Sequence, residues 1–193
     1  MNIAIIPARG GSKRIPRKNI KEFCGKPMIA WSIEAALASR LFAHVLVSTD
    51  DAEIADVARS AGAEVPFLRP AELSDDHAGT TGVIAHGTAW ALARSWEVSA
   101  VCCLYPTAPF VRCEDLARGL EMLEASDLQY VFAATSFAYP ILRSFLEMEG
   151  GRVSMCFPER FEALPARSSR SPARCRSVLL GQARCLVERC KSS

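Results

Sequence analysis

An apolar segment near the start of the chain runs directly into a loop that is rich in glycine and cations. Residues 3–6 (IAII) are all hydrophobic, as is typical of a strand buried on both faces of a parallel sheet. In residues 8–19 (the opening loop), Gly10 and Gly11 allow the backbone N–H groups to converge on an anion. Three side chains of this loop add positive charge: Arg9, Lys13 and Arg17. The stretch therefore predicts a strand that ends in a polyphosphate-binding loop.

The opening loop lacks two common phosphate-binding patterns. Neither the G-x-x-x-x-G-K-[ST] spacing of a Walker loop nor the G-x-G-x-x-G fingerprint of dinucleotide-binding folds is present. Glycines and cations also occur together in solvated turns that only link a strand to a helix. From composition alone, both interpretations of the loop stay open.

Further along the chain, segments with helical spacing of apolar residues alternate with short apolar segments. The pattern predicts helices at residues 27–39, 51–61, 80–94 and 113–125, and strands at residues 44–48, 64–67, 100–104 and 130–134. This alternation indicates an α/β fold with three layers, in which helices cover both faces of a mostly parallel, open, Rossmann-type sheet. Ligands of such sheets bind beyond the carboxyl ends of the strands, so the opening loop should meet residues 48–51 and 105–109 there.

Composition limits the class of protein. A chain of 193 residues, of which 50% are hydrophobic, is long enough for one globular domain. It contains no leader pattern and no apolar run of about 20 residues, so we expect a cytoplasmic protein with no membrane partner. The eight cysteines form no C-x-x-C pair, which argues against a zinc site. Cys102 and Cys103, within an apolar segment, are expected to be small core residues.

The net charge of +2 conceals an asymmetry along the chain. Up to Pro165 there are 16 Lys and Arg residues against 20 Asp and Glu, whereas from Ala166 onward there are 7 against 1. A basic end of this kind is often an arm that binds nucleic acid.

Several long motifs resemble the acylneuraminate cytidylyltransferases, the family of the CMP-sialic acid synthetases. They are IPARGGSKRIPRKNI at residues 6–20, GKPMI at 25–29, VSTDD at 47–51, FLRPAELSDDHAGT at 67–80 and YPTAPF at 105–110. YPTAPF and FAYPILRSF, at residues 137–145, are most similar to the branch that activates pseudaminic acid. The resemblance ends after Glu162.

The resemblance implies transfer of CMP from CTP to a nonulosonic acid, with release of pyrophosphate, for surface glycan or flagellin glycosylation. Pseudaminic acid is the first expectation, and N-acetylneuraminate or legionaminate the alternative. Lys13 and Arg9 would be the catalytic cations. The nucleotide would contact Ala8, Arg9, Gly10, Gly11, Ser12, Lys13, Asn19, Arg69, Thr80 and Thr81, and the sugar would contact Tyr105, Thr107, Tyr139 and Arg143. Among these, Arg143 suits the carboxylate of the sugar, because a guanidinium binds a carboxylate bidentately.

The resemblance also implies Mg²⁺ or Mn²⁺ and a homodimer. The adjacent carboxylates of Asp50 and Asp51 could hold the metal; Asp51 is also well suited to cap the following helix, so Asp50 is the candidate metal ligand. Residues 75–77 (DDH) read more simply as a solvated loop than as a metal cluster. Residues 137–157 would project toward a second subunit through a hairpin that turns at Gly150 and Gly151, and the alternative is a plain surface hairpin.

Other site residues have structural alternatives that the sequence leaves open. Asn19 either contacts the triphosphate or closes the loop, or it is a simple turn residue. Arg69 either lies near the cytosine or pairs with Glu72 or Asp75. Thr80 and Thr81 either reach the base or cap a helix.

Residues 163–193 (the tail) depart from the family pattern, in which a segment such as HDAGQFYWG carries a metal-binding aspartate. Codons can be chosen for residues 176–190 that read GQFYWGKRDAWLNG after loss of one nucleotide, and residues 173–175 then supply HDA. Pro172 does not yield the tyrosine expected before this segment. The hypothesis is that the tail is translated out of frame, which explains its basic composition without nucleic acid. Its few apolar groups predict poor order, apart from a short helix near residues 179–189.

Overall fold

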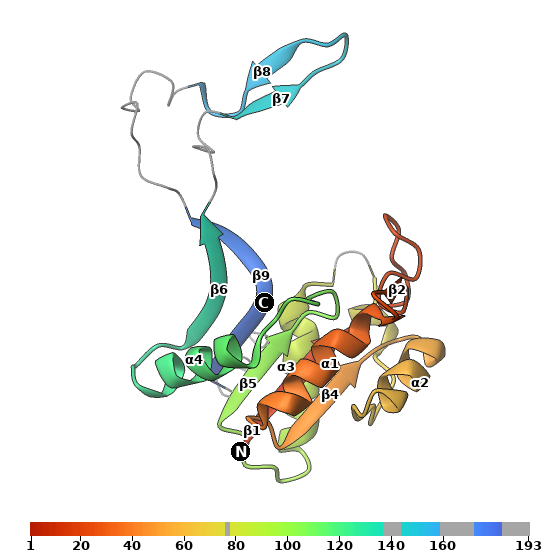
Figure 1. Ribbon diagram of the computed structural model, residues 1–193, viewed down its shortest axis with the longest axis vertical. Helices are drawn as coiled ribbons and strands as arrows, with labels where there is room; N and C mark the ends of the chain where they lie inside the picture. Colours follow the sequence, from red (N-terminus) through yellow and green to blue (C-terminus); the bar gives the residue numbers. More distant parts are fainter. Residues whose placement is uncertain (76–77, 137–143, 159–171, 183–193) are drawn as a thin grey trace. The chain divides into compact units, whose positions relative to one another are not determined.

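The first strand of the chain lies inside the main sheet. The computed structural model describes residues 1–75, 78–136, 144–158 and 172–182. In it, β1 (Asn2–Pro7) pairs in parallel with β4 (His44–Ser48) on one side and with β5 (Ala100–Leu104) on the other (Figure 1). The sheet order is β4-β1-β5-β9-β6, with β6 at Tyr130–Ser136 and β9 at Pro172–Gln182. The predicted mostly parallel sheet is confirmed, and β9 is antiparallel to β5.

Alternate residues of the central strands face two separate hydrophobic clusters. Ala4 and Ile6 pack in a cluster with residues of α1 (Met28–Ser39), α2 (Ala52–Ser60) and α4 (Cys113–Glu124). Ile3 and Ile5 pack in the other, with Ile84 of α3 (Thr80–Leu92). Figure 1 shows α1 and α3 on opposite sides of the sheet. A strand that is apolar at every position is therefore needed here, and the predicted three-layer α/β architecture is confirmed.

The helices follow their apolar spacing and begin and end close to the predicted positions. In α4, Leu116, Leu120 and Leu123 are buried on one side, while Glu114 and Asp115 lie in the first turn, where the helix dipole favours negative charge. α3 ends at Leu92, two residues before the predicted end. Residues 71–73 form a short 3-10 helix (Ala71–Leu73) that the sequence analysis did not predict.

Two short strand predictions need correction. Residues 64–67 do not form a strand; Glu64 makes an isolated bridge to Leu46, and Leu68 makes another to Thr49. The unpredicted strands β2 (Glu22–Phe23) and β3 (Lys26–Pro27) form a small hairpin just before α1. Its turn uses positive φ at Cys24 (49°) and Gly25 (85°). Pro27 ends β3 and is the N-cap of α1, so it lies just outside the helix.

Residue contacts divide the chain into two compact units, Met1–Ala133 with Arg176–Ser193, and Ala134–Cys175. Within the second unit, β7 (Phe145–Glu147) pairs with β8 (Val153–Met155) in an antiparallel hairpin. Gly150 and Gly151 adopt φ of 78° and 72° in the connection, as the predicted hairpin turn requires. Tyr139 and Arg143, predicted sugar contacts, lie outside the described residues.

The tail contributes a strand where a helix was predicted. Val178–Leu180 of β9 pair with Leu104–Cys102 of β5, so residues 179–182 are extended, and the prediction of a helix there is wrong. Residues 183–189, the rest of the predicted helix, lie outside the described part of the chain. Among the described helices, none is long and apolar enough to cross a membrane.

The burial of β5 makes a prediction about cysteine reactivity. Cys102 and Cys103 are at most 1% exposed, as predicted for core residues, whereas Cys24 is exposed. Burial raises the pKa of both core thiols, that of Cys103 to about 12, so neither thiol should be ionised to a useful extent at pH 8. Iodoacetamide should label Cys24 within minutes and should leave Cys102 and Cys103 unlabelled until denaturant is added. Peptide mass spectrometry measures this, and labelling of all three at one rate in the native protein would contradict the packing.

Candidate functional site

A pocket of about 240 Å³ opens beyond the carboxyl ends of β1 and β5. Its wall combines residues from the opening loop, from the segment around the 3-10 helix, from the start of α3 and from the loop after β5. They are Pro7, Arg9, Lys18, Asn19, Arg69, Leu73, Asp75, Ala78, Thr80, Val83, Tyr105, Pro106 and Thr107. Six predicted site residues are thus brought together: Arg9, Asn19, Arg69, Thr80, Tyr105 and Thr107.

Other predicted residues of the opening loop lie around this pocket without forming its wall. Ala8 is fully buried and donates its backbone N–H to the Ser48 carbonyl at 2.9 Å, which fixes the start of the loop to the end of β4. Gly11 and Lys13 are exposed, and Gly10 and Ser12 are partly so. Their roles in nucleotide binding, and that of exposed Thr81 on the first turn of α3, stay predictions.

Asn19 closes the opening loop. Its side chain is nearly buried, and Nδ2 donates to the Arg9 carbonyl at 2.9 Å. The Asn19 carbonyl accepts from the Ile29 backbone N–H at 2.8 Å, which ties the end of the loop to the first turn of α1. Asn19 therefore closes the loop, as one of the alternatives predicted, and its contact with the triphosphate stays a prediction. The Oδ1 atom of Asn19 is buried and has no hydrogen-bond partner within the described residues. Asn19 also lines the pocket.

Arg69 is 7% exposed and braces the pocket from the side of β4. Its guanidinium donates to the carbonyls of Ser48 at 2.8 Å and Leu73 at 3.3 Å. Burial lowers the pKa of Arg69, the Asp50 carboxylate opposes this shift, and the charge of Arg9 adds to it. Because Arg9 and Arg69 both line this pocket, their guanidinium groups are suited to bind an anion. The buried Nε of Arg69 has no partner in the described part of the chain.

Tyr105 connects the loop after β5 to two helices. Its hydroxyl lies 3.1 Å from Oγ1 of Thr80, and its carbonyl accepts from Oγ of Ser32 on α1 at 2.8 Å. Thr80 is the first residue of α3, and Gly79 is the N-cap without a side-chain bond. The alternative that Thr80 caps this helix is therefore wrong.

Asp50 and Asp51 have different partners. Asp51 is the N-cap of α2, where Oδ1 accepts from the Ile54 N–H at 3.0 Å, so capping is confirmed. A hydrogen bond from Arg17 and a second from the Ile54 amide lower the pKa of Asp51. Asp50 is exposed, and its Oδ1 accepts from the Gly10 N–H at 2.9 Å. A search of the described residues finds no group of three or more His, Cys, Asp or Glu side chains placed to hold a metal.

Sequence reasoning chose the wrong cation at the end of the opening loop. Lys18 lines the pocket, whereas Arg17 pairs with Asp51 and with Glu53 of α2. Residues 17 and 18 are both basic, and the left-handed backbone of Arg17 (φ 55°), which sequence alone does not reveal, decides which one faces the pocket. Asp75 was also missed as a wall residue; its carboxylate accepts from the Ala78 N–H at 2.6 Å, and its carbonyl accepts from Arg9 at 3.0 Å. Asp76 and His77 are not described.

The assembled pocket is suited to a ligand that carries both phosphate groups and other polar groups. Arg9, Lys18 and Arg69 supply cations, and the glycine-rich backbone lies beside them. Thr80, Tyr105 and Thr107 supply hydroxyl groups to the wall of the same pocket. Such a site can bind a nucleotide and fix its phosphates by charge and hydrogen bonds.

Comparisons with known proteins point to enzymes that use nucleotides. A pseudaminic acid cytidylyltransferase of Campylobacter jejuni subsp. jejuni serotype O:2 is 47% identical over 154 residues, which cover 80% of this chain and 66% of the relative. The chain thus spans just under two thirds of that relative. A CMP-N,N'-diacetyllegionaminic acid synthase of Legionella pneumophila is 34% identical over 174 residues, covering 88% of this chain and 72% of the relative.

Solved structures and a family profile complete the comparison. A CMP:2-keto-3-deoxy-manno-octonic acid synthetase, solved in complex with CTP, superposes with a TM-score of 0.71 at 20% identity, over 98% of this chain and 77% of the other. This likeness supports the fold. Residues 3–139 match the profile of the family described as cytidylyltransferase. The profile match and the sequence relatives together show that the chain belongs to the cytidylyltransferase family.

Proposed function

We propose that this chain joins CMP from CTP to pseudaminic acid. The observation that carries the proposal is the pocket itself, whose wall includes the cations Arg9 and Lys18 of the opening loop and the buried Arg69. The 47% identity to a pseudaminic acid cytidylyltransferase supports pseudaminic acid as the sugar substrate. Legionaminate or N-acylneuraminate is the second candidate, and the 34% identity to a legionaminic acid synthase supports it.

In the proposed reaction, the anomeric hydroxyl of the sugar attacks the α-phosphorus of CTP. A new bond joins the sugar oxygen to phosphorus, the α–β phosphoanhydride bond breaks, pyrophosphate leaves, and the hydroxyl proton passes to solvent. Because most of the catalysis of phosphoryl-group transfer is positioning and charge stabilisation, cations near the leaving phosphates are the main requirement. Arg9, Ser12 and Lys13 would hold the triphosphate, with Lys13 nearest to the transferred group.

A divalent cation, Mg²⁺ or Mn²⁺, would shield charge on the phosphates. Asp50 fits it in part, since Mg²⁺ is commonly held by one or two carboxylates together with substrate phosphates. One Asp50 oxygen already accepts from Gly10, and the carboxylate is exposed. Tyr105, Thr107, Tyr139 and Arg143 would contact the sugar, with Arg143 paired to its carboxylate.

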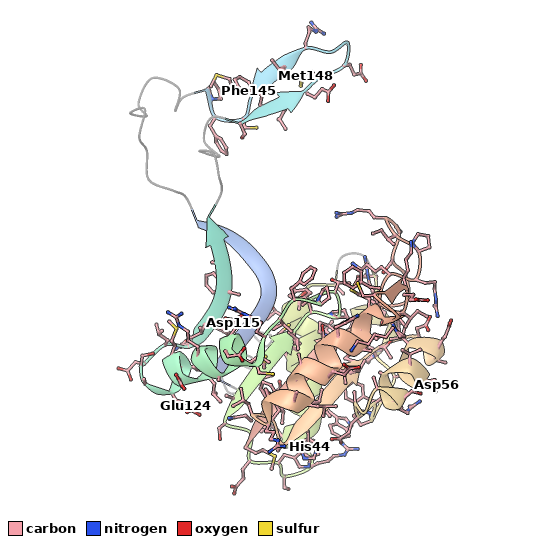
Figure 2. The ribbon with its side chains drawn as sticks, in the orientation of Figure 1. His44, Asp56, Asp115, Glu124, Phe145 and Met148 are labelled. Atoms are coloured by element: carbon pink, nitrogen blue, oxygen red, sulfur yellow. The ribbon has the colours of Figure 1, made fainter. Side chains whose placement is uncertain are left out.

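The hairpin of β7 and β8 supports a homodimer in the proposal. Phe145 (58% exposed), Leu146, Met148 and Val153 expose large apolar side chains on this short hairpin, on which Figure 2 labels Phe145 and Met148. A two-stranded hairpin is marginally stable in water, so apolar groups on it are suited to contact with a second subunit. The reaction would take place in the cytoplasm, where CTP is supplied, and nucleic acid has no part in it.

The tail bears on activity. We propose that it is read out of frame, because a one-nucleotide shift in a possible coding of residues 173–181 gives the family-like reading HDAGQFYWG. The present chain would then lack the metal-binding aspartate of that reading, with Arg174 in its place. We therefore expect this chain to bind CTP weakly and to turn it over slowly.

The first test of the proposal is CTP-dependent release of pyrophosphate with a panel of nonulosonic acids. Pseudaminic acid should give the highest rate. Lys13→Ala should lower turnover or CTP affinity by about tenfold or more with little change in thermal stability, because the side chain lies on an exposed loop. An unchanged rate and CTP affinity in this variant would reject the assignment of Lys13.

The second test concerns the sugar carboxylate. Arg143→Ala should raise the KM for the sugar by about tenfold while the KM for CTP changes little, since the guanidinium would contact only one substrate. Steady-state kinetics with each substrate varied in turn measures both values. Equal increases in the two KM values would count against the role.

The third test restores the reading frame after residue 162. The restored protein should turn over at least about tenfold faster than the 193-residue chain, because it regains the aspartate of HDAGQ. A chain that ends at Glu162 is the control that separates loss of the present tail from gain of the restored segment. Equal turnover of the 193-residue and restored proteins, or a coding region in which no inserted or deleted base restores HDAGQFYWG, would reject the hypothesis.

A further inference from the structure

Arg17 belongs to the opening loop but points its charge away from the pocket. Its guanidinium binds Asp51 through two hydrogen bonds, one of them 3.1 Å from Nη2 to Oδ1, and also binds Glu53. Both carboxylates lie at the start of α2, Asp51 as the N-cap and Glu53 in the first turn. Arg17, Asp51 and Glu53 (the loop clasp) therefore join the end of the opening loop to a helix more than 30 residues further along the chain.

The backbone of Arg17 is adapted to this contact. Its φ of 55° lies in the left-handed region, which is unfavourable for a residue with a side chain and persists where surrounding contacts hold it. The Arg17 carbonyl accepts from the N–H groups of Ile20 at 3.1 Å and Lys21 at 3.0 Å. Both the side chain and the backbone of Arg17 are thus held by hydrogen bonds. The turn that begins at Arg17 brings Lys18 and Asn19 to the pocket.

The first limb of the opening loop lies against Asp50 and Asp51, the second of which also belongs to the clasp. The Gly10 N–H donates to Asp50 at 2.9 Å. A Cβ at Gly10 would lie 2.6 Å from Oδ2 of Asp51 and 3.0 Å from its Cβ, so glycine is required for this close approach. Both limbs of the loop are consequently docked on residues 50–53, and Ser12 and Lys13 lie on the arc between them.

Charge explains why the clasp matters for an anionic ligand. Three carboxylates, Asp50, Asp51 and Glu53, lie beside a loop that is suited to phosphate, and unpaired they would repel it. Arg17 neutralises two of them while it orders the loop. Because its planar fork is occupied by Asp51, it is not placed to bind phosphate as well.

We propose that Arg17 is a positioning residue, which holds the opening loop in its ligand-binding shape through Asp51 and Glu53. The inference rests on the proposed function, because the ligand whose binding it serves is CTP. It differs from the simple interpretation in which Arg17 is one more phosphate ligand. The two interpretations predict opposite effects for loss of the Asp51 charge.

The test uses Arg17→Ala and Asp51→Asn in the full chain, with Arg14→Ala as the matched control. Asparagine preserves the helix cap, so Asp51→Asn removes mainly the charge that holds Arg17. Arg14 is an exposed cation of the same loop, so its loss changes net charge as much as loss of Arg17 does. Two quantities are measured: the Kd for CTP by calorimetry, and hydrogen exchange of the backbone amides of residues 8–21 by mass spectrometry.

With a clasp, Arg17→Ala and Asp51→Asn should each weaken CTP binding and speed loop exchange by about tenfold, and the double variant should be no worse than either single one. Arg14→Ala should stay within about twofold of the wild type. Arg17→Lys should give a Kd for CTP and a loop exchange rate between those of the wild type and Arg17→Ala, because lysine keeps the charge but lacks the planar guanidinium. If Arg17 were a phosphate ligand, Asp51→Asn would free it and bind CTP as tightly as the wild type or more tightly.

That result, or equal effects of Arg14→Ala and Arg17→Ala, would overturn the proposal. A wild-type chain that does not bind CTP at all would reject the proposed function instead. The clasp is then judged by hydrogen exchange alone, where unchanged loop exchange in Arg17→Ala and Asp51→Asn would overturn it.

Discussion

The attachment of the opening loop to the end of β4 is the interaction on which the site depends. Ala8 and Arg69 both donate to the Ser48 carbonyl, and Gly10 donates to Asp50. Two of these bonds end on the backbone carbonyl of the last residue of β4, and the third ends on the carboxylate of Asp50, two residues further along. They bring a glycine-rich loop and a buried arginine to one edge of the sheet, so the pocket is formed by the same contacts that end the strands.

Much of the fold could be predicted from the apolar pattern, since the all-apolar strands β1 and β5 imply two covered faces. The cysteines of β5 behaved as core residues for the same reason. The hairpin at residues 22–27 was missed because it turns at Cys24 with positive φ, a conformation that the presence of a cysteine does not predict. The strand β9 was missed because its composition is basic and its pairing partner, β5, is far away in sequence.

The site was predicted less completely than the fold. Tyr105 directly follows β5 and could be placed because topology brings strand ends together, whereas Arg69 was placed by the family resemblance. The roles of Arg17 and Lys18 could not be separated, because both are cations on one loop and only the backbone conformation distinguishes them. The capping role of Asp51 was one of two alternatives, and the choice needed its contact with the Ile54 amide. The residue types of the opening loop were therefore enough to predict a phosphate-binding loop. The role of each residue in it depends on contacts with residues far away in the sequence.

The most direct test of a triphosphate site at the opening loop is to compare the equilibrium binding of CTP with that of CMP by calorimetry. If the loop holds the β- and γ-phosphates, CTP should bind at least about tenfold more tightly than CMP in the same buffer, and the difference should shrink as salt is added. Equal affinities for CTP and CMP, with the same salt dependence, would contradict a site whose main contacts are made to the triphosphate.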